Sequence, residues 1–223
     1  MTDGKSGRRL AAVAVGVLGI VTGLTAAAPK RPMGFFIASS NPGTGANLGG
    51  LKGADQLCQS LATAAGAGQR TWHAYLSTAP TDGKPGVDAR SRIGRGPWYN
   101  AKGELVALNV ADLHGAASAF TKQTALNERG EVVNGRGDTP NRHDILTGSG
   151  LDGRLAPGEG DRTCGNWTSQ AETGAAAAVG HFDRQGGGIN PTSHIFAHAS
   201  RGCSLPALQS TGGDGLLYCF AAR

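Results

Sequence analysis

The amino-acid sequence predicts an α+β fold made mostly of short antiparallel strands, with one main helix and long loops. Apolar runs of strand length stand near both ends of the chain and through its C-terminal half, whereas the main helical pattern occurs early. An α/β fold would instead alternate strands and helices along the whole chain. Glycine contributes 37 of 223 residues and falls in clusters without a three-residue period, which indicates a globular fold with many tight turns rather than collagen.

The first elements are expected to be a strand, the main helix and a second strand. The apolar run Gly34–Ser40 precedes a turn containing Pro and Gly, and it predicts a strand. The segment Gly53–Gly68 predicts the main helix, because its apolar residues recur at spacings of three and four and glycines follow them. These apolar residues are Leu57, Cys58, Leu61, Ala62 and Ala65. Alternation over Arg70–Thr78 predicts a second strand that turns Trp72 to one side and Tyr75 to the other.

The following segments predict shorter elements. Two extended pieces are expected in Gly96–Leu108, one or two helical turns in Asn109–Ala116, and a hairpin around Glu128–Gly130. Short strands with long polar loops between them complete the chain. They are expected at Asp144–Ser149, Thr163–Ser169, Ala175–Asp183 and Gly215–Ala222. No internal repeat or linker divides these segments, so residues 34–223 are expected to form one domain after a short linker at 29–33.

The N-terminus has the pattern of a secretory signal peptide over residues 1–28. A short basic start precedes a long apolar run, and Ala26–Ala28 offers small residues for cleavage. An uncleaved membrane anchor is the alternative, because a run of about 19 residues is just long enough to span a bilayer. Cleavage is favoured, since the run is rich in Ala and Gly. The sequence therefore predicts a secreted protein, in the periplasm or at the cell surface.

The charge pattern argues against nucleic acid as a partner. Removing residues 1–28 takes away three basic residues and one acidic residue, so the formal net charge falls from +5 to +3. Aromatic residues make up only 5% of the chain, and no dense stripe of Lys and Arg interleaves with them. No membrane contact is expected beyond the signal segment.

Four cysteines remain in the exported part: Cys58, Cys164, Cys203 and Cys219. An even number of cysteines in an oxidising compartment indicates disulfides. A zinc site is the competing interpretation, but the chain holds no Cys-x-x-Cys pair and the spacings are wide. Three pairings of four cysteines are possible, and the spacing leaves all three open.

Several segments together resemble the C-type lectin-like fold, most closely its endostatin branch and bacterial exported proteins that carry this domain. The similar segments, in the family's order, cover residues 51–78, 99–115, 124–133, 145–169 and 201–221. The first joins a Gly-Ala-Asp turn, a helix bearing a cysteine and an aromatic strand. The resemblance implies two nested disulfides, Cys58–Cys219 and Cys164–Cys203, and a ligand-binding role for the long loops between about residues 149 and 202.

Calcium-dependent sugar binding of the usual kind is not implied. In this fold it uses a Glu-Pro-Asn or Gln-Pro-Asp tripeptide and a Trp-Asn-Asp triplet, which supply oxygen ligands. Here Asn166 and Trp167 stand in the wrong order, and Asn190 precedes Pro191 without a flanking acid. The candidate ligand-binding residues are Asn166, Trp167, His181, Asp183, Asn190, His198 and Arg201.

Histidines give the only candidate metal ligands. His181 with Asp183, and His194 with His198, could bind a transition metal if their loop folds back. The prediction is nevertheless that no metal or other cofactor is held, because no helix is expected to align the last two. The zinc site of endostatin uses N-terminal histidines, and nothing in residues 29–40 matches them, so that site does not carry over.

Three arginines, Arg90, Arg92 and Arg95, form the densest basic cluster. Because endostatin binds heparin through arginines, the resemblance implies a candidate anion site here. A solvated surface without a partner is the favoured interpretation of the three arginines, and the anion site is the alternative.

The Arg-Gly-Asp tripeptide at Arg136–Asp138 has the composition of an exposed turn, and it does not predict an adhesion motif. The chain also lacks a G-x-S-x-G elbow, a zinc-binding H-E-x-x-H pair and a phosphate-binding loop, so it is not expected to be an enzyme. The expected function is binding of a glycan, an extracellular polymer or a protein through the loops of about 149–202. A metal-dependent hydrolase that uses the same loops is the alternative.

Overall fold

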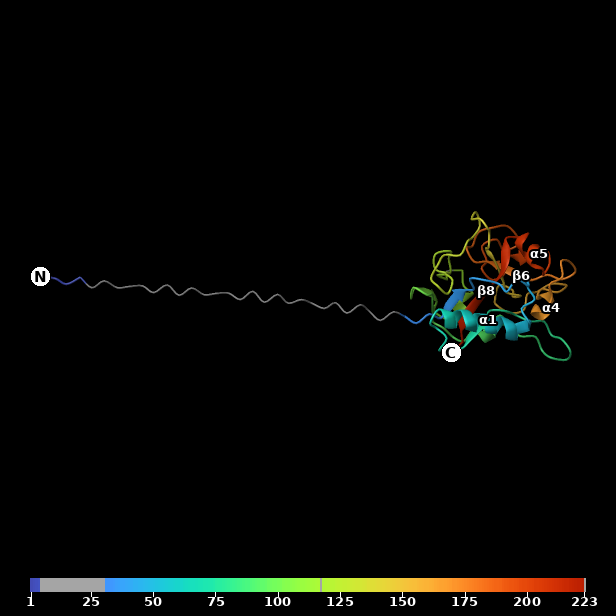
Figure 1. The fold of residues 1–223 in the computed structure, drawn as a ribbon, viewed down its shortest axis with the longest axis horizontal. Coiled ribbons are helices and arrows are strands. Elements are labelled where there is room, and N and C mark those ends of the chain that lie inside the picture. The colour runs from blue at the N-terminus through green and yellow to red at the C-terminus, as the bar shows by residue number, and fades with distance from the viewer. Residues whose placement is uncertain (5–30, 117, 223) are drawn as a thin grey trace.

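The structure of this chain is a computed structural model that describes residues 1–4, 31–116 and 118–222. The expected signal segment, residues 1–28, lies almost entirely outside these ranges. In the described part the chain is a mixed α+β protein with few helices, short strands and two disulfides (Figure 1). No helix in those ranges is long and apolar enough to cross a membrane. The coarse fold class expected from the sequence is therefore confirmed.

The main sheet is built around its C-terminal strand. β8 (Gly213–Ala221) pairs antiparallel with β1 (Phe35–Ile37) along one edge and with β2 (Trp72–Ala74) along the other. The backbone N–H of Ala221 also donates to the carbonyl of Gly34 at 2.9 Å, so the first and last strands lie side by side. The strands expected at 34–40, 70–78 and 215–222 are confirmed with different bounds.

The other half of the sheet carries β5 (Asp144–Leu146), β6 (Ala178–His181) and β7 (His198–Ala199). β5 runs parallel to β8, and β6 pairs antiparallel with both β5 and β7. In this register Asp144 lies opposite His181, and Val179 lies opposite His198. Three segments that are far apart in the sequence thus meet in one part of the sheet.

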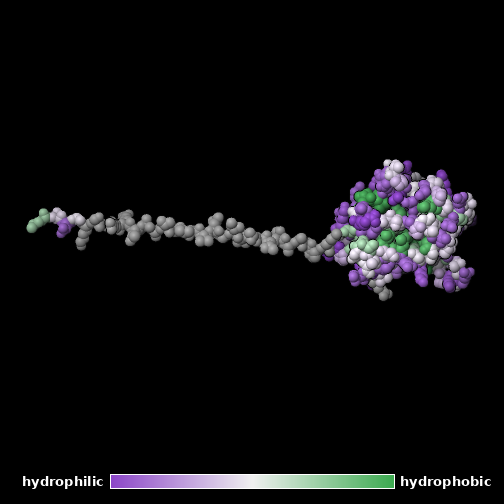
Figure 2. Space-filling view, viewed as in Figure 1, coloured by the Kyte–Doolittle hydropathy of each residue, from purple (hydrophilic) through white to green (hydrophobic). Residues whose placement is uncertain are grey.

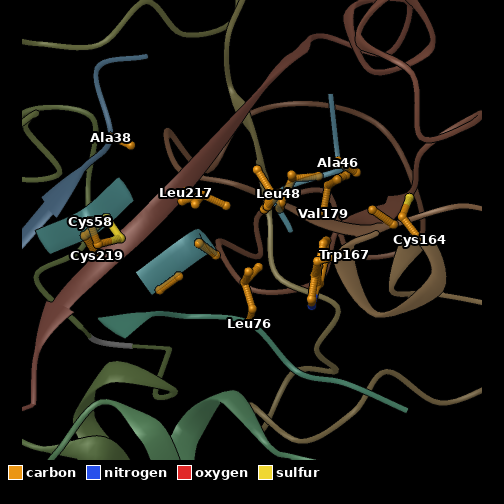
Figure 3. Close-up of a cluster of buried hydrophobic side chains, with 14 of the residues drawn as sticks. Ala38, Ala46, Leu48, Cys58, Leu76, Cys164, Trp167, Val179, Leu217 and Cys219 are labelled. Carbon is orange, nitrogen blue, oxygen red and sulfur yellow. A yellow bond between two sulfur atoms is a disulfide. The ribbon is translucent and has the colours of Figure 1, made fainter. Parts of the chain in front are cut away.

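Both faces of the sheet are buried, each by its own hydrophobic cluster. Along β8, Leu217 and Cys219 belong to one cluster, and Tyr218 and Phe220 belong to the other. Part of the first cluster, which includes Leu217, is drawn in Figure 3. Tyr75, expected on the polar side of its strand, is fully buried because this second face is covered as well.

Helix α1 (Gly50–Ala64) covers the first face of the sheet and confirms the expected main helix. Its buried residues, Ala54, Cys58 and Ala62, follow each other at a spacing of four and point to one side. Cys58 forms a disulfide with Cys219, which ties the helix to the central strand β8. Ala65, expected on the apolar face, is instead an exposed cap residue outside the helix, and the buried face ends at Ala62.

Several short elements lie between β2 and β5. They are α2 (Ala89–Arg92), β3 (Trp98–Tyr99), β4 (Leu105–Ala107) and α3 (Val110–Leu113). β3 and β4 form a separate two-stranded antiparallel sheet, as the two extended pieces predicted. The expected hairpin turn is also confirmed, since the N–H of Asn127 donates to the carbonyl of Glu131 at 3.0 Å.

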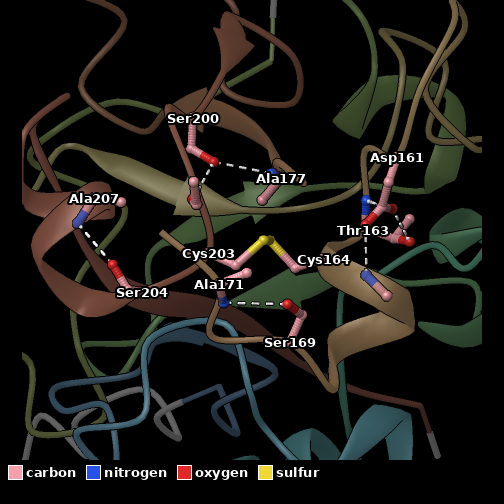
Figure 4. Close-up of a disulfide and its surroundings, with 12 residues drawn as sticks. Asp161, Thr163, Cys164, Ser169, Ala171, Ala177, Ser200, Cys203, Ser204 and Ala207 are labelled. Atoms are coloured by element: carbon pink, nitrogen blue, oxygen red, sulfur yellow. Dashed lines mark hydrogen bonds between the residues drawn. A yellow bond between two sulfur atoms is a disulfide. The ribbon is translucent and has the colours of Figure 1, made fainter. Parts of the chain in front are cut away.

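The second disulfide, Cys164–Cys203, joins α4 (Cys164–Trp167) to the residues just before α5 (Leu205–Gln209) (Figure 4). The prediction of a strand at 163–169 is wrong. There the Asp161 carboxylate accepts from the N–H groups of Thr163 and Gly165, which closes a short turn in which Gly165 and Asn166 have positive φ angles. Both bridges match the nested pairing that the resemblance implied.

Helix α5 was not expected, and its first turn depends on a side-chain cap. Oγ of Ser204 accepts from the backbone N–H of Ala207 at 3.2 Å (Figure 4). We expect Ser204→Ala to lower the free energy of unfolding by about 1 kcal/mol, measured by urea denaturation. Ser60→Ala is the matched control, because Ser60 is exposed on α1, and its change should stay within about 0.5 kcal/mol. Equal losses in the two variants would show that the cap does not stabilise α5.

The molecular surface is mostly hydrophilic on the face seen in Figure 2, with smaller apolar areas between the polar ones. The large apolar side chains exposed in the folded part are Leu108, Val132, Leu151 and Ile189. They come from separate loops, and scattered exposed apolar residues are ordinary on a protein surface. The buried polar groups are therefore the stronger candidates for a functional site.

Candidate functional site

Three histidines converge on one buried carboxylate where β5, β6 and β7 lie side by side. Oδ1 of Asp144, the first residue of β5, is their common neighbour. It lies 3.3 Å from Nε2 of His143, 3.2 Å from Nε2 of His181 and 3.5 Å from Nε2 of His198. We call these four residues the histidine cluster. The strand register explains it, because β6 ends at His181 opposite Asp144 and β7 begins at His198.

The other ring nitrogen of each histidine faces an oxygen that can only accept a hydrogen bond. Nδ1 of His181 lies 2.9 Å from the carbonyl of Pro191, and Nδ1 of His198 lies 3.0 Å from that of Ala199. Nδ1 of His143 lies 3.3 Å from Oδ1 of Asp183. For His181 and His198 these contacts favour a proton on Nδ1 and leave Nε2 toward the centre of the cluster, whereas each ring nitrogen of His143 lies 3.3 Å from a carboxylate oxygen.

The centre of the cluster is buried and lacks hydrogen bonds. Asp144 is 2% exposed, and neither of its carboxylate oxygens has a hydrogen-bond partner among the described residues, nor does Nε2 of His181. Burial would raise the pKa of the Asp144 carboxyl, but His181 and His198 outweigh it and lower the pKa to about 2. The same carboxylate raises the pKa of His198 above its usual value. Asp144 is therefore an anion among three imidazoles.

A second buried carboxylate, Asp183, stands behind His143. Its Oδ2 accepts from the backbone N–H of Arg136 at 2.6 Å, and its Oδ1 accepts from that of Gln185 at 3.1 Å. Burial would raise the pKa of Asp183, but these contacts and His143 outweigh it and lower the pKa. Asp183 thus fixes the ring of His143 and holds the turn at Arg136 against the cluster.

Two glycines give the imidazoles their space. A Cβ at Gly186 would lie 2.4 Å from Cε1 of His181, and one at Gly212 would lie 2.9 Å from Nε2 of His143. Both residues also have positive φ angles, +144° and +106°, which side chains rarely adopt. Any larger residue at these positions would push a ring away from Asp144.

An open cavity of about 540 Å³ lies over the histidine cluster, and we call it the cluster cavity. His143, His181 and His198 line it, and the turn at Arg136, the glycines 187–188 and the residues around Arg201 surround it. Arg136 and Arg201 are exposed, and neither side chain forms an ion pair or hydrogen bond with the described residues. The cavity therefore combines two guanidinium groups with three imidazoles, whose common neighbour Asp144 is buried behind them.

The structure brings four of the candidate residues to this site. His181, His198 and Arg201 line the cluster cavity, and Asp183 contacts His143 behind it. His194 is not part of the site, because its Nε2 lies 2.9 Å from the carbonyl of Leu113 inside the second hydrophobic cluster. Burial lowers the pKa of His194 to about 3.

The remaining ligand-binding candidates have structural contacts elsewhere. Trp167 is fully buried in the first hydrophobic cluster, and its Nε1–H donates to the carbonyl of Ser77 at 2.8 Å. The Asn166 amide both accepts from and donates to the backbone of Ala79. The backbone carbonyl of Asn190 accepts from the N–H of Ser193, and this hydrogen bond closes a turn in the loop. None of the three lines the cluster cavity.

The basic cluster is largely occupied by structural contacts. Arg92 forms an ion pair with Asp55 at 2.6 Å and donates to the carbonyl of Ala74. Nη1 of Arg90 donates to the carbonyl of Asp152 at 2.8 Å. Of the three arginines proposed as an anion site, only Arg95 has no ion pair or hydrogen bond within the described residues.

Sequence reasoning missed His143 and Asp144 as functional residues. Both precede the apolar residues of β5, and the sequence pattern there predicts only a strand. An acidic residue that begins a fully buried strand and follows a histidine can indicate a functional site. The reason is that buried carboxylates are rare unless they are paired or bound to a metal.

Comparison with known proteins adds no further assignment. A scan against models of protein families gives no match to this sequence. A search of curated proteins gives none either. The support for a function therefore comes from the side chains of the histidine cluster and the cavity above it.

Proposed function

We propose that this protein is an exported binding protein that recognises an acidic glycan or polymer outside the cell. We also propose that its fold is C-type lectin-like, of the endostatin type. Two disulfides support an oxidising compartment. The nested pairing and the order of α1, β2 and β8 support the fold proposal.

The observation that carries the binding proposal is the pair of arginines at the cluster cavity. Neighbouring arginines have structural partners: Arg142 pairs with Asp214 at 3.0 Å, and Arg184 donates to Phe120 and Ser118. Arg136 and Arg201 have no such partner in the described part of the chain. A guanidinium group binds carboxylate, sulfate or phosphate through two parallel hydrogen bonds. The two side chains are therefore suited to an acidic ligand that enters the cavity.

The size of the cavity agrees with this use. Its volume of about 540 Å³ falls within the range of about 300–1,000 Å³ that holds small ligands. The ligand would be bound in part by residues 181–201, inside the loop region that the sequence indicated, and in part by Arg136 and the turn after α5.

The experiment compares acidic and neutral members of the same glycan series on an array. We expect the wild-type protein to bind the acidic members, and Arg136→Ala and Arg201→Ala each to weaken binding by about 10- to 100-fold, since a charged hydrogen bond contributes roughly 1.5–3 kcal/mol. Arg95→Ala is the matched control, because Arg95 is exposed and lies outside the cavity. Equal binding of neutral glycans, binding to a protein ligand alone, or an equal loss in the control would contradict the proposal.

A metal-dependent hydrolase at the same cavity is the second candidate function. The observation that favours it is the group His143, Asp144 and His181, whose ligand atoms lie within 4.8 Å of one another beside the cavity. Imidazole and carboxylate ligands of this kind hold the metal ions that activate water in hydrolytic sites. Turnover of chromogenic ester and phosphoester substrates, lost in Asp144→Asn, would support it. Binding of acidic glycans without any turnover would support the first function.

A further inference from the structure

We propose that the histidine cluster is a binding site for a transition-metal ion, with Zn²⁺ as the first choice. The four ligands are Nε2 of His143, His181 and His198 and a carboxylate oxygen of Asp144. This inference stands on the geometry of the cluster and does not depend on the identity of the ligand in the cavity. It differs from the expectation from the sequence that no metal is held.

The ligand atoms of His143, Asp144 and His181 lie within 4.8 Å of one another, and the distances from Oδ1 of Asp144 to the three Nε2 atoms match the ligand spacing around a tetrahedral ion better than hydrogen-bond lengths. Two ligand atoms that each lie about 2.1 Å from a tetrahedral zinc ion lie about 3.4 Å from each other. The three distances from Asp144 Oδ1 to the Nε2 atoms are 3.2, 3.3 and 3.5 Å. A normal N–H···O bond is about 2.9 Å long.

Buried groups without partners also favour a cation at the centre. Both carboxylate oxygens of Asp144 and Nε2 of His181 are buried without a hydrogen-bond partner in the described part of the chain. Unpaired polar groups in a buried site are costly. A metal ion beside Asp144 would bind these atoms together with Nε2 of His143 and His198.

A metal-free cluster is the competing explanation, and burial makes it the poorer one. Asp144 is 2% exposed, and without a metal neither of its carboxylate oxygens has a hydrogen-bond partner in the described part of the chain. His143 and His181 beside it are 4% and 1% exposed, and their rings stack with centroids 4.3 Å apart. An unpaired carboxylate in such buried surroundings is costly.

The surroundings have the features of a metal site. Ligating histidines usually donate their second ring N–H to a carboxylate or a backbone carbonyl, and all three histidines here face such an oxygen. Three nitrogens and one carboxylate suit Zn²⁺ and similar transition metals, whereas Ca²⁺ and Mg²⁺ prefer oxygen ligands. His198, whose side chain is 21% exposed, provides access for the ion from the cluster cavity.

The test uses untagged protein, stripped with a chelator and titrated with Zn²⁺ in a calorimeter. We expect one equivalent of zinc per chain by elemental analysis, and visible absorption bands of a four-coordinate site when Co²⁺ replaces zinc. His198→Ala should weaken zinc binding by more than the roughly 10- to 100-fold that loss of an outer partner costs. His73→Ala, whose ring contacts Arg92 on another part of the surface, is the control and should bind zinc like the wild type.

Two outcomes would overturn the proposal. The first is that the stripped protein binds none of Zn²⁺, Co²⁺, Ni²⁺ and Cu²⁺ at micromolar concentration. The cluster would then be a metal-free set of hydrogen-bonding groups. The second is wild-type zinc affinity in both His198→Ala and Asp144→Asn, which would place any bound zinc elsewhere. If Asp144→Asn does not fold, His198→Ala decides, since its side chain is the most exposed of the four. Because no glycan is present, failure of the glycan array leaves this result unaffected.

Discussion

Replacing Cys58 and Cys219 together with alanine should lower the free energy of unfolding by about 5 kcal/mol, the value that the chain-entropy model gives for so long a loop. The bridge joins residues that are 161 positions apart, so it restricts most of the unfolded chain. It also fixes α1 to β8, the strand with which β1, β2 and β5 all pair. Denaturation in guanidinium chloride, under conditions that keep the remaining disulfide intact, measures the loss.

The second bridge provides the matched comparison. Cys164 and Cys203 are 39 positions apart, for which the same model gives about 4 kcal/mol. We therefore expect the Cys164→Ala, Cys203→Ala variant to lose about 1 kcal/mol less than the first variant. A larger loss from the inner bridge would contradict the entropic explanation and would indicate that local contacts around α4 and α5 dominate.

The strands and the main helix could be predicted because each depends on a local pattern. Apolar residues at spacings of three and four predict α1, and alternation of side chains predicts β2. The burial of Tyr75 could not be predicted in this way, since it requires a second hydrophobic cluster formed by residues such as Phe120 and Phe220 from other parts of the chain. The short helix at Cys164–Trp167 was missed because the side chains of Asp161 and Thr163, rather than apolar periodicity, close its turn.

The histidine cluster shows a different limit of sequence reasoning. The spacing of four residues suggests that His194 and His198 share a site, but the chain between them is not helical. His194 contacts the carbonyl of Leu113, whereas His198 contacts Asp144. His143 and His181 are separated by 38 positions and meet only through the pairing of β5 with β6. Strand register, which a single sequence does not reveal, therefore decided the composition of the site.

The glycine clusters, first taken as a sign of tight turns, also have a role at the site. Gly186 and Gly212 allow the backbone to approach His181 and His143 so closely that no side chain would fit. Backbone on both sides of the rings holds their Nε2 atoms toward Asp144. The same glycine content that suggested a loop-rich fold thus supports a rigid arrangement of ligands.

Asp183→Asn should weaken zinc binding by about 10- to 100-fold while the four proposed ligands stay in place. Asp183 does not face the centre of the cluster; it acts by accepting from Nδ1 of His143 at 3.3 Å. A carboxylate there keeps the proton on Nδ1 and makes Nε2 more basic. An amide is neutral, and if it turns its NH₂ group toward Nδ1, the proton moves to Nε2 and that ligand is lost. Zinc titration of the stripped protein measures the change in affinity.

Two further measurements separate this positioning role from a general loss of structure. Asp183 also accepts from the N–H of Arg136 at 2.6 Å, so the thermal unfolding of the metal-free variant must be compared with that of the wild type. Asp138→Asn is the matched control, because Asp138 is exposed on the same loop and pairs with Lys122. We expect the cobalt spectrum of Asp183→Asn to shift, as the bond from His143 weakens, and that of Asp138→Asn to match the wild type. A carboxylate that orients His143 cannot be made neutral without changing how that ring binds the metal. Unchanged zinc affinity together with an unchanged cobalt spectrum in Asp183→Asn would therefore show that Asp183 only holds the loop.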